Sequence, residues 1–293
     1  PGQMPVIPGY VLEKELGRGG MGAVYLATAE GTEDRFALKV MDLEKMEGTM
    51  AERFAREAKL GDMLKHPDIV HLYGAGTTEK LAYIAMEFLD GFELSDAMRD
   101  AEFGLDDRIQ VAVRVAHALH YAHGQGVLHR DVKPSNIFMT YDGQVRLLDF
   151  GIARVLSDVK LTRTGLIVGT PRYMSPEQLT AGRVDHRTDV FALGVVLYEC
   201  LTGSTPWPAD NQGQLVIDVC TKPPQPLTAF LKPGDFGLDE ERLAALDAII
   251  QKAIAPEVEH RIADAEEIAT LLSGNVQGTT APAPASSVNW REG

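Results

Sequence analysis

Hydrophobic residues alternate with other residues in several segments as far as Leu89, which is the pattern of β-strands with one buried face. The alternation covers residues 10–17, 23–29, 35–41 and 81–89. One segment, 50–64, instead places Met50, Phe54 and Leu64 at helical spacing. We therefore expect a strand-rich N-terminal part that is interrupted by one helix.

From Glu93 onward the spacing of hydrophobic residues becomes helical. Residues 107–126 read as a long amphipathic helix that ends at glycine. Residues 188–203 read as a buried helix, and residues 241–254 and 263–272 as two further helices. The sequence therefore predicts an α+β chain, with a small sheet-rich half followed by a larger, mainly helical half. Clefts between halves of this kind are common ligand sites.

Length and charge narrow the class of protein. The chain has 293 residues and 45% hydrophobic content, which suits one large domain or two small ones. Its formal net charge is -14, so we expect no general binding of nucleic acid or of anionic membranes, although a local basic pocket for a phosphate is still allowed. The longest nearly apolar run, 190–201, is shorter than the roughly 20 residues that span a bilayer, so we expect no membrane contact by this segment.

The two cysteines, Cys200 and Cys220, have no second cysteine or histidine at metal-ligand spacing. This predicts neither a disulfide framework nor a zinc site and fits a reducing compartment. We interpret residues 1–9 as an N-terminal extension, with residues left from cloning ahead of Met4. Residues 274–293 are rich in Pro, Ala, Ser and Thr and read as a linker or tail, so we expect the chain to be part of a longer protein.

Three glycines, Gly17, Gly19 and Gly22, have the spacing G-x-G-x-x-G. A dinucleotide-binding turn would continue into a helix, but here a strand-like run begins at Val24. The spacing favours a glycine-rich hairpin whose backbone can approach phosphates. The alternative is an ordinary tight turn.

Lys39 lies in the next predicted strand, on the same face as the small Ala37, where it could pair with nucleotide phosphates. The alternative is a solvated lysine at the edge of the sheet. Glu57, in the predicted helix, is of interest only as a partner for Lys39, because most charged side chains on a helix face simply meet water.

The stretch HRDVKPSN, residues 129–136, concentrates charged and polar groups between apolar flanks. Such groups belong either to a solvated loop or to a site. Asp131 could accept a hydroxyl proton, and Lys133 could neutralise a phosphate that is being transferred. Asn136, together with Asp149 after a further strand, offers the oxygen ligands that Mg²⁺ prefers.

The order of these motifs, followed by DFG and a late SPE, is that of the protein-kinase signature. Between about Tyr10 and Leu272 the chain resembles the catalytic domain of a bacterial Hanks-type, eukaryotic-like Ser/Thr protein kinase. The resemblance implies a bilobal kinase fold over residues 10–273, with a small lobe at 10–87, a hinge at 87–91 and a helical lobe at 92–273. It also implies transfer of the γ-phosphate of ATP to Ser or Thr hydroxyls of protein substrates, with Mg²⁺ or Mn²⁺.

The resemblance assigns roles to individual residues. The catalytic set that it implies is Lys39, Glu57, Asp131, Lys133, Asn136, Asp149 and Thr170, with Asn136 and Asp149 as metal ligands. The nucleotide-binding set that it implies is Leu16, Gly17, Arg18, Gly19, Gly20, Met21, Gly22, Ala23, Val24, Ala37, Lys39, Met86, Glu87, Leu89 and Phe138. It further implies that Glu177 pairs with Arg261 and that Asp189 braces the backbone of the catalytic loop, residues 129–136.

The resemblance also suggests regulation and partners. Because Arg130 precedes Asp131, we expect control by phosphate on the activation loop, residues 149–177, with autophosphorylation at Thr162 and Thr164. The alternative is that both are ordinary loop threonines. A phosphothreonine there could recruit a forkhead-associated domain, and some relatives form homodimers through the small lobe. We expect the domain to be cytoplasmic, as a separate protein or as part of a membrane-anchored one.

Two residues depart from the usual pattern of the family. Ser175 replaces the alanine of A-P-E, a mild change, and Gly61 stands where kinases carry a larger apolar residue. We therefore expect the helix at 50–64 to be mobile without ligand or partner. A rival interpretation is a pseudokinase that binds nucleotide as a scaffold without transfer. A kinase acting on small molecules is disfavoured by the activation segment.

Overall fold

The computed structural model describes residues 4–19, 22–43, 63–150 and 171–275. The chain divides into two compact units, Pro1–Asp90 and Gly91–Gly293. The expected α+β class is confirmed, because an antiparallel sheet fills the first unit and helices make up most of the second. The helix expected at 50–64, including Gly61, lies outside the described residues except at its last two positions.

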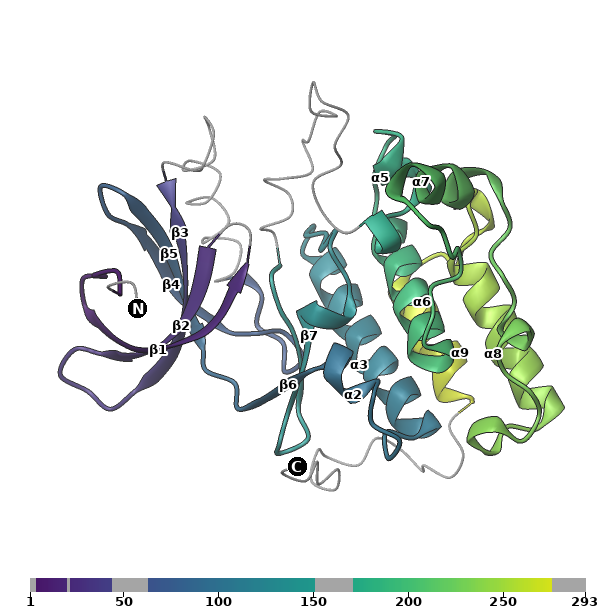
Figure 1. Ribbon diagram of the computed structural model, residues 1–293, viewed down its shortest axis with the longest axis horizontal. Coiled ribbons are helices and arrows are strands. Elements are labelled where there is room, and N and C mark those ends of the chain that lie inside the picture. The colour runs from purple at the N-terminus through teal and green to yellow at the C-terminus, as the bar shows by residue number, and fades with distance from the viewer. Residues whose placement is uncertain (1–3, 20–21, 44–62, 151–170, 276–293) are drawn as a thin grey trace. The chain divides into compact units, whose positions relative to one another are not determined.

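A five-stranded antiparallel sheet forms the first unit (Figure 1). Its spatial order is β1-β2-β3-β5-β4. The strands are β1 (Tyr10–Gly19), β2 (Gly22–Ala29), β3 (Arg35–Asp42), β4 (Leu72–Thr77) and β5 (Leu81–Glu87). The alternating segments of the sequence correspond to β1, β2, β3 and β5. Strand β4 was not predicted, because its sequence LYGAGT contains two glycines and does not alternate.

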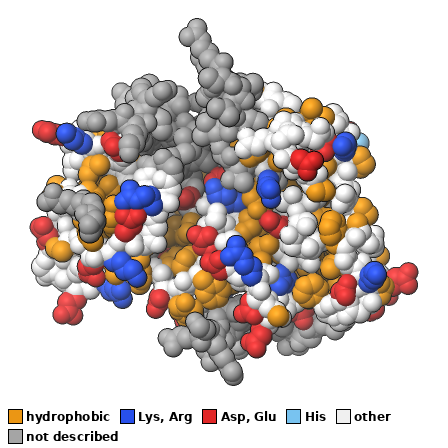
Figure 2. All heavy atoms as spheres, viewed as in Figure 1, with side chains coloured by type: hydrophobic (Ala, Val, Ile, Leu, Met, Phe, Trp, Pro, Cys, Tyr) orange, Lys and Arg blue, Asp and Glu red, His pale blue; other side chains and the backbone are white. Residues whose placement is uncertain are grey.

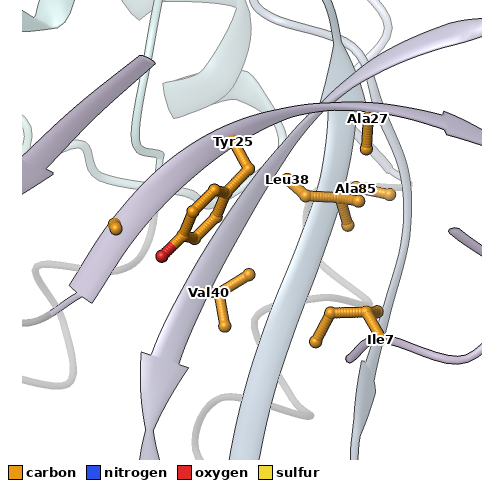
Figure 3. Packing of buried hydrophobic residues seen from close by; sticks show 7 residues of the cluster. Ile7, Tyr25, Ala27, Leu38, Val40 and Ala85 are labelled. Carbon is orange, nitrogen blue, oxygen red and sulfur yellow. The ribbon is translucent and has the colours of Figure 1, made fainter. Parts of the chain in front are cut away.

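One face of this sheet carries a hydrophobic cluster that includes Tyr25, Leu38, Val40 and Ala85 (Figure 3). The register explains the cluster, since Leu38 faces Tyr25 on β2 and Ala85 on β5. Ile7 packs into the same cluster and is only 1% exposed. A residue from the segment interpreted as an extension therefore belongs to the core of the sheet.

The second unit contains seven described helices and a small sheet of order β6-β7-β8 (Figure 1). The helices are α2 (Leu94–Ala97), α3 (Leu105–Gly124), α5 (Pro176–Leu179), α6 (Arg187–Thr202), α7 (Gln212–Thr221), α8 (Glu240–Ala253) and α9 (Ala265–Ser273). The strands are β6 (Gly91–Glu93), β7 (Ile137–Thr140) and β8 (Val145–Leu147). Helix α6 packs against α3, α8 and α9, and so lies at the centre of the unit.

Local sequence explains where the main helices begin and end. Asp239 and Asp264 accept hydrogen bonds from the N–H groups of the third residues of α8 and α9. Helix α6 ends at Thr202, and the next residue, Gly203, has a φ of 71°, the left-handed C-terminal conformation that favours glycine. Almost every side chain of α6 is buried, as its apolar sequence predicts. None of the helices in the described ranges has the length and apolar character needed to span a bilayer.

Candidate active site

The polar stretch 129–136 forms a loop between α3 and β7. Gly126, with φ 75°, turns the chain at the end of α3, and the buried Val127 and Val132 anchor the loop to the core. The charged side chains of the loop can then point away from the core while its apolar residues are buried. The sequence therefore folds here into a supported loop rather than a free solvated one.

Asp131, Lys133 and Asn136 are held together in this loop. Lys133 Nζ lies 2.7 Å from Asp131 Oδ2, and Asn136 Nδ2 lies 3.0 Å from the same oxygen. The Asp131 side chain is still 32% exposed. Because both donors within the described residues use Oδ2, the other carboxylate oxygen, Oδ1, is left to accept a hydrogen bond from a substrate.

The orientation of the Asn136 amide follows from its partners. Its nitrogen donates both to Asp131 Oδ2 and to the Asp131 carbonyl oxygen, at 2.7 Å. Both partners are acceptors, so the amide oxygen must point the other way, where it could ligate a cation. Asn136 is itself buried, which fixes this arrangement.

Asp149 follows β8 and is tied to the same loop, because the Leu148 N–H donates to the Asn136 carbonyl oxygen at 2.8 Å. Its φ of 60° is left-handed, an uncommon conformation for a residue that is not glycine, and such strain often marks functional sites. One amide oxygen and one carboxylate on linked segments suit Mg²⁺, a hard cation that prefers oxygen ligands.

His129, which is fully buried, supports the loop from the protein interior. The Asp131 N–H donates to His129 Nδ1 at 3.2 Å, so the proton of the neutral ring must be on Nε2, which donates to the Leu148 carbonyl at 2.7 Å. The ring also packs edge-on against Phe150, with centroids 4.7 Å apart. His129 thus links the catalytic loop to the segment that carries Asp149.

Asp189 braces the loop backbone, as the resemblance implied, and this expectation is confirmed. Its carboxylate accepts from the N–H groups of His129 at 2.8 Å and Arg130 at 2.6 Å, and from His123 Nε2 at 2.8 Å. Burial alone would raise the pKa of the Asp189 carboxyl. The His123 and Arg130 hydrogen bonds and the neighbouring imidazoles outweigh burial and hold that pKa below its usual range.

The expected pair of Glu177 and Arg261 is also confirmed. The guanidinium meets the carboxylate with two parallel hydrogen bonds of 2.7 and 2.8 Å, and the Thr188 hydroxyl donates a third at 2.7 Å. Burial would raise the pKa of the Glu177 carboxyl, but the bonds from Arg261 and Thr188 lower it below the usual value. This pair connects α5 to the segment that precedes α9.

Ser175 has a larger structural role than a mild replacement for alanine. It is fully buried, and its hydroxyl lies 3.3 Å from both Gln178 Oε1 and Thr188 Oγ1. Gln178 in turn donates to the Arg130 carbonyl at 2.9 Å. Sequence reasoning did not single out Gln178, and the only signal for it was the capping pattern S-x-x-Q ahead of an apolar residue.

In the first unit, the glycine-rich segment forms a hairpin, with Gly19 facing Gly22 in the register of β1 and β2. A Cβ at Gly22 would lie 2.1 Å from the Val40 carbonyl oxygen, so this position requires glycine. Within the hairpin, Arg18 Nε donates to Glu15 Oε1 at 2.8 Å. The predicted hairpin is confirmed in the residues that flank Gly20 and Met21, which lie outside the described residues.

The sheet register brings several of the expected nucleotide-binding residues to one face. Val24 faces Lys39 and Ala37 faces Met86, so all four lie on the face opposite the cluster in Figure 3. Lys39 is half-buried. An apolar face that also carries one lysine suits a ring with phosphates attached to it.

The remaining expected residues have varied positions. Leu16 is 43% exposed and lies where the register of β1 shifts, and Ala23 belongs to the cluster face, away from Val24. Glu87 is anchored twice to His71, through N–H to carbonyl at 2.9 Å and through its carboxylate to the His71 N–H at 2.8 Å. Leu89 and Phe138, on separate units, are each half-buried.

Some expected residues fall in parts of the chain that the structure does not describe. These are Gly20, Met21, Glu57, Thr162, Thr164 and Thr170. Within the described ranges, no group of three or more His, Cys, Asp or Glu side chains could hold a metal ion. Asn136 and Asp149 would therefore need oxygen ligands from substrate phosphates and water, which is how Mg²⁺ is usually held.

Comparison with known proteins decides the family. Residues 10–270 match the protein kinase domain family. This chain belongs to the protein kinase family. The comparisons confirm the expected family, fold and enzyme class of the domain, which are those of a bacterial Hanks-type Ser/Thr protein kinase domain. Kinases of this family use ATP and act on proteins.

The chain is 39% identical over 295 residues to the serine/threonine-protein kinase PknJ of Mycobacterium tuberculosis, covering 97% of this chain and 49% of PknJ. It is 37% identical to PknH of Mycobacterium bovis, covering 89% of this chain and 43% of PknH. It is also 39% identical to the tyrosine-protein kinase MasK of Myxococcus xanthus, covering 93% of this chain and 44% of MasK. The chain thus spans about half the length of the curated relatives it matches.

The crystal structure of the Mycobacterium tuberculosis PknI kinase domain superposes with a TM-score of 0.71 at 28% sequence identity. That match covers 92% of this chain and 97% of the PknI domain. The likeness therefore extends over the whole kinase fold.

Proposed function

We propose that this domain transfers the γ-phosphate of ATP to serine and threonine hydroxyls of protein substrates. The observation that carries the proposal is the Asp131 carboxylate, held on one oxygen by Lys133 and Asn136 with its other oxygen left for a donor. Asp131 would orient the substrate hydroxyl and accept its proton. Lys133 would neutralise charge on the transferred phosphate, so catalysis would consist mainly of positioning and electrostatic stabilisation.

The residues proposed to bind nucleotide and metal come from both units. Asn136 and Asp149 would hold Mg²⁺, or Mn²⁺, which would neutralise the phosphate oxygens. In the first unit, Lys39 would bind phosphates, with Glu57 as its partner. The hairpin would cover the phosphates, and the face that includes Ala37 and Met86 would receive the adenine.

The test is mass spectrometry of the purified chain after incubation with ATP and Mg²⁺, beside Asp131→Asn. We expect added phosphate in the unsubstituted chain alone, and none when EDTA replaces Mg²⁺. Asn is isosteric with Asp but cannot accept the proton. Equal phosphate gain in both proteins would refute the role of Asp131. No transfer to the chain or to a generic protein substrate would favour the scaffold interpretation.

The choice between serine or threonine and tyrosine needs a separate measurement, because one relative is named a tyrosine kinase. We propose Ser/Thr specificity on the basis of Lys133 and Thr170. Acid hydrolysis of the phosphorylated products should release phosphoserine and phosphothreonine. Phosphotyrosine as the main product would contradict the proposal.

Regulation by the activation loop is a further part of the proposal. Autophosphorylation at Thr162 and Thr164 would give Arg130 a phosphate to bind and would create a docking site for a forkhead-associated domain. Replacing both threonines by alanine should remove most of the incorporated phosphate and lower activity toward other substrates. Unchanged incorporation would show that these are ordinary loop residues.

We propose that the domain lies in the cytoplasm, either as a separate protein or as the kinase domain of a membrane-anchored one. We also propose that it forms a homodimer through the small lobe. Sedimentation of the domain at increasing concentration tests the dimer. The domain boundaries given above, with the kinase domain at 10–273, stay predictions, and limited proteolysis can locate them.

A further inference from the structure

The backbone just before the candidate catalytic carboxylate is strained. Arg130 has a φ of 66°, in the left-handed region that residues other than glycine rarely adopt. Such a conformation persists only when neighbouring groups enforce it. The contacts that enforce it here therefore also fix the residue that follows, Asp131.

The peptide group between Arg130 and Asp131 is held at both of its ends. Its N–H, from Asp131, donates to His129 Nδ1 at 3.2 Å. Its carbonyl oxygen, from Arg130, accepts from Gln178 Nε2 at 2.9 Å. On the other side of the strained residue, the Arg130 N–H donates to the buried Asp189. Gln178, which lies outside the loop, thus holds the carbonyl end of this peptide.

The side-chain amide of Gln178 acts both as an acceptor and as a donor. Its oxygen, Oε1, accepts from the Ser175 N–H at 3.0 Å, which caps α5, and its nitrogen donates to the Arg130 carbonyl. The two partners demand an acceptor on one side and a donor on the other. A neutral amide meets both demands, whereas a carboxylate meets only the first.

We infer that Gln178 is a positioning residue for phosphotransfer: through the Arg130 carbonyl it holds the peptide plane that orients Asp131. The inference rests on the proposed kinase function. It also connects α5 to the catalytic loop, so displacement of α5 would move the carboxylate. Gln178 itself touches no reacting atom.

The substitution Gln178→Glu separates this role from the capping role. Glutamate keeps the acceptor for the Ser175 N–H, so the melting temperature should stay close to that of the unsubstituted chain. Its second oxygen would face the Arg130 carbonyl and repel it. We expect kcat to fall about tenfold to a hundredfold, with KM for ATP little changed, because small displacements of a catalytic group have costs of this size.

Acidification gives a signature that a merely structural role would not give. Partial burial and the facing Arg130 carbonyl would raise the pKa of the introduced carboxyl above the ordinary glutamate value. The protonated acid can donate to that carbonyl, so the kcat of the variant divided by that of the unsubstituted chain should rise as pH falls from about 8 to about 5.5. Gln251→Glu is the matched control. Gln251 also donates to a backbone carbonyl, that of Gln225, at 3.1 Å in an exposed position, and its kcat should not change.

Hydrogen exchange tests the same claim without relying on activity. The Asp131 amide should exchange faster in Gln178→Glu than in the unsubstituted chain, while peptides from α6 exchange equally in both. If the unsubstituted chain transfers no phosphate, the proposed function fails but this measurement still decides the positioning role. Unchanged kcat and exchange would overturn the inference. So would a loss of kcat that is independent of pH or is matched by a loss of melting temperature.

Discussion

Replacement of Glu177 by glutamine should strongly destabilise the second unit. The carboxylate is 9% exposed and the Arg261 guanidinium is fully buried. Removing the charge of one partner leaves the other buried without its counter-charge, which typically costs about 3–5 kcal/mol. Glutamine has the shape of glutamate, so the effect reports charge and hydrogen bonding rather than volume.

The contacts of Arg261 place the expected loss near the lower end of that range. Its Nε donates to the Ala255 carbonyl at 2.8 Å, and Nη2 donates to the Pro256 carbonyl at 3.0 Å. These carbonyl oxygens still accept hydrogen bonds from the guanidinium after the carboxylate is replaced by a neutral amide. We therefore expect a loss of about 3 kcal/mol, equivalent to roughly 6–12 °C in the melting temperature of a domain of this size.

Urea unfolding, followed by tryptophan fluorescence, measures this loss. Trp207 is a suitable reporter, because it is 3% exposed and stacks on Phe191, the ring that Arg261 also covers. Glu267→Gln is the control, since Glu267 lies 2.8 Å from Lys252 but its side chain is 35% exposed, and such pairs are worth about 0.2–1 kcal/mol. Equal losses in the two variants would refute the argument that burial sets the cost.

Three further predictions concern the pH dependence of stability, the Asp189 carboxylate that holds the catalytic loop, and the packing of α6. Because the folded state lowers the pKa of Glu177, its contribution to stability is present above the ordinary pKa of about 4.3 and is lost as pH falls through the folded value, so the stability gap to Glu177→Gln should close in acid unfolding curves. Asp189→Asn should cut kcat at least tenfold in steady-state assays, because one atom of the new amide would face an N–H donor of the loop. Gly194→Ala should destabilise by roughly 1–3 kcal/mol in urea, since its Cβ would lie 2.6 Å from Ile254 Cγ2, whereas Gly124→Ala, with open space around it, should not destabilise.

The sequence predicted most of the elements that repeat a simple pattern. Alternation located β1, β2, β3 and β5, and the apolar run of α6 indicated a buried helix, because burial on one face or on all faces leaves a direct trace in composition. Strand β4 and helix α7 left no such trace. β4 has glycines where alternation needs side chains, and α7 carries a consecutive run of β-branched and apolar residues, 215–217, rather than apolar residues at helical spacing. The burial of Ile7 depends on a sheet formed by residues far along the chain.

The residues of the site fall into two similar groups, those that can be recognised from local sequence and those that depend on distant contacts. The types and spacing of Asp131, Lys133 and Asn136 could be recognised locally, because their contacts lie within one loop. The partners of Asp189 and Glu177 came only from resemblance to a family, since each pair joins residues far apart in sequence. Gln178 was missed because its contact with Arg130 spans 48 positions and its own surroundings indicate no more than a helix cap.

Two of the described non-glycine residues with left-handed φ belong to the site, and they show why sequence reasoning fails where it does. Arg130 and Asp149 both have left-handed φ values that local preference would assign to glycine. Around Arg130 the described contacts come from distant helices, through Asp189 on its N–H and Gln178 on its carbonyl. A side chain that is wanted for chemistry at such a position cannot be exchanged for glycine, so the strain must be offset by tertiary contacts instead. The residues that supply those contacts are then as necessary to the site as the residues that carry its chemistry.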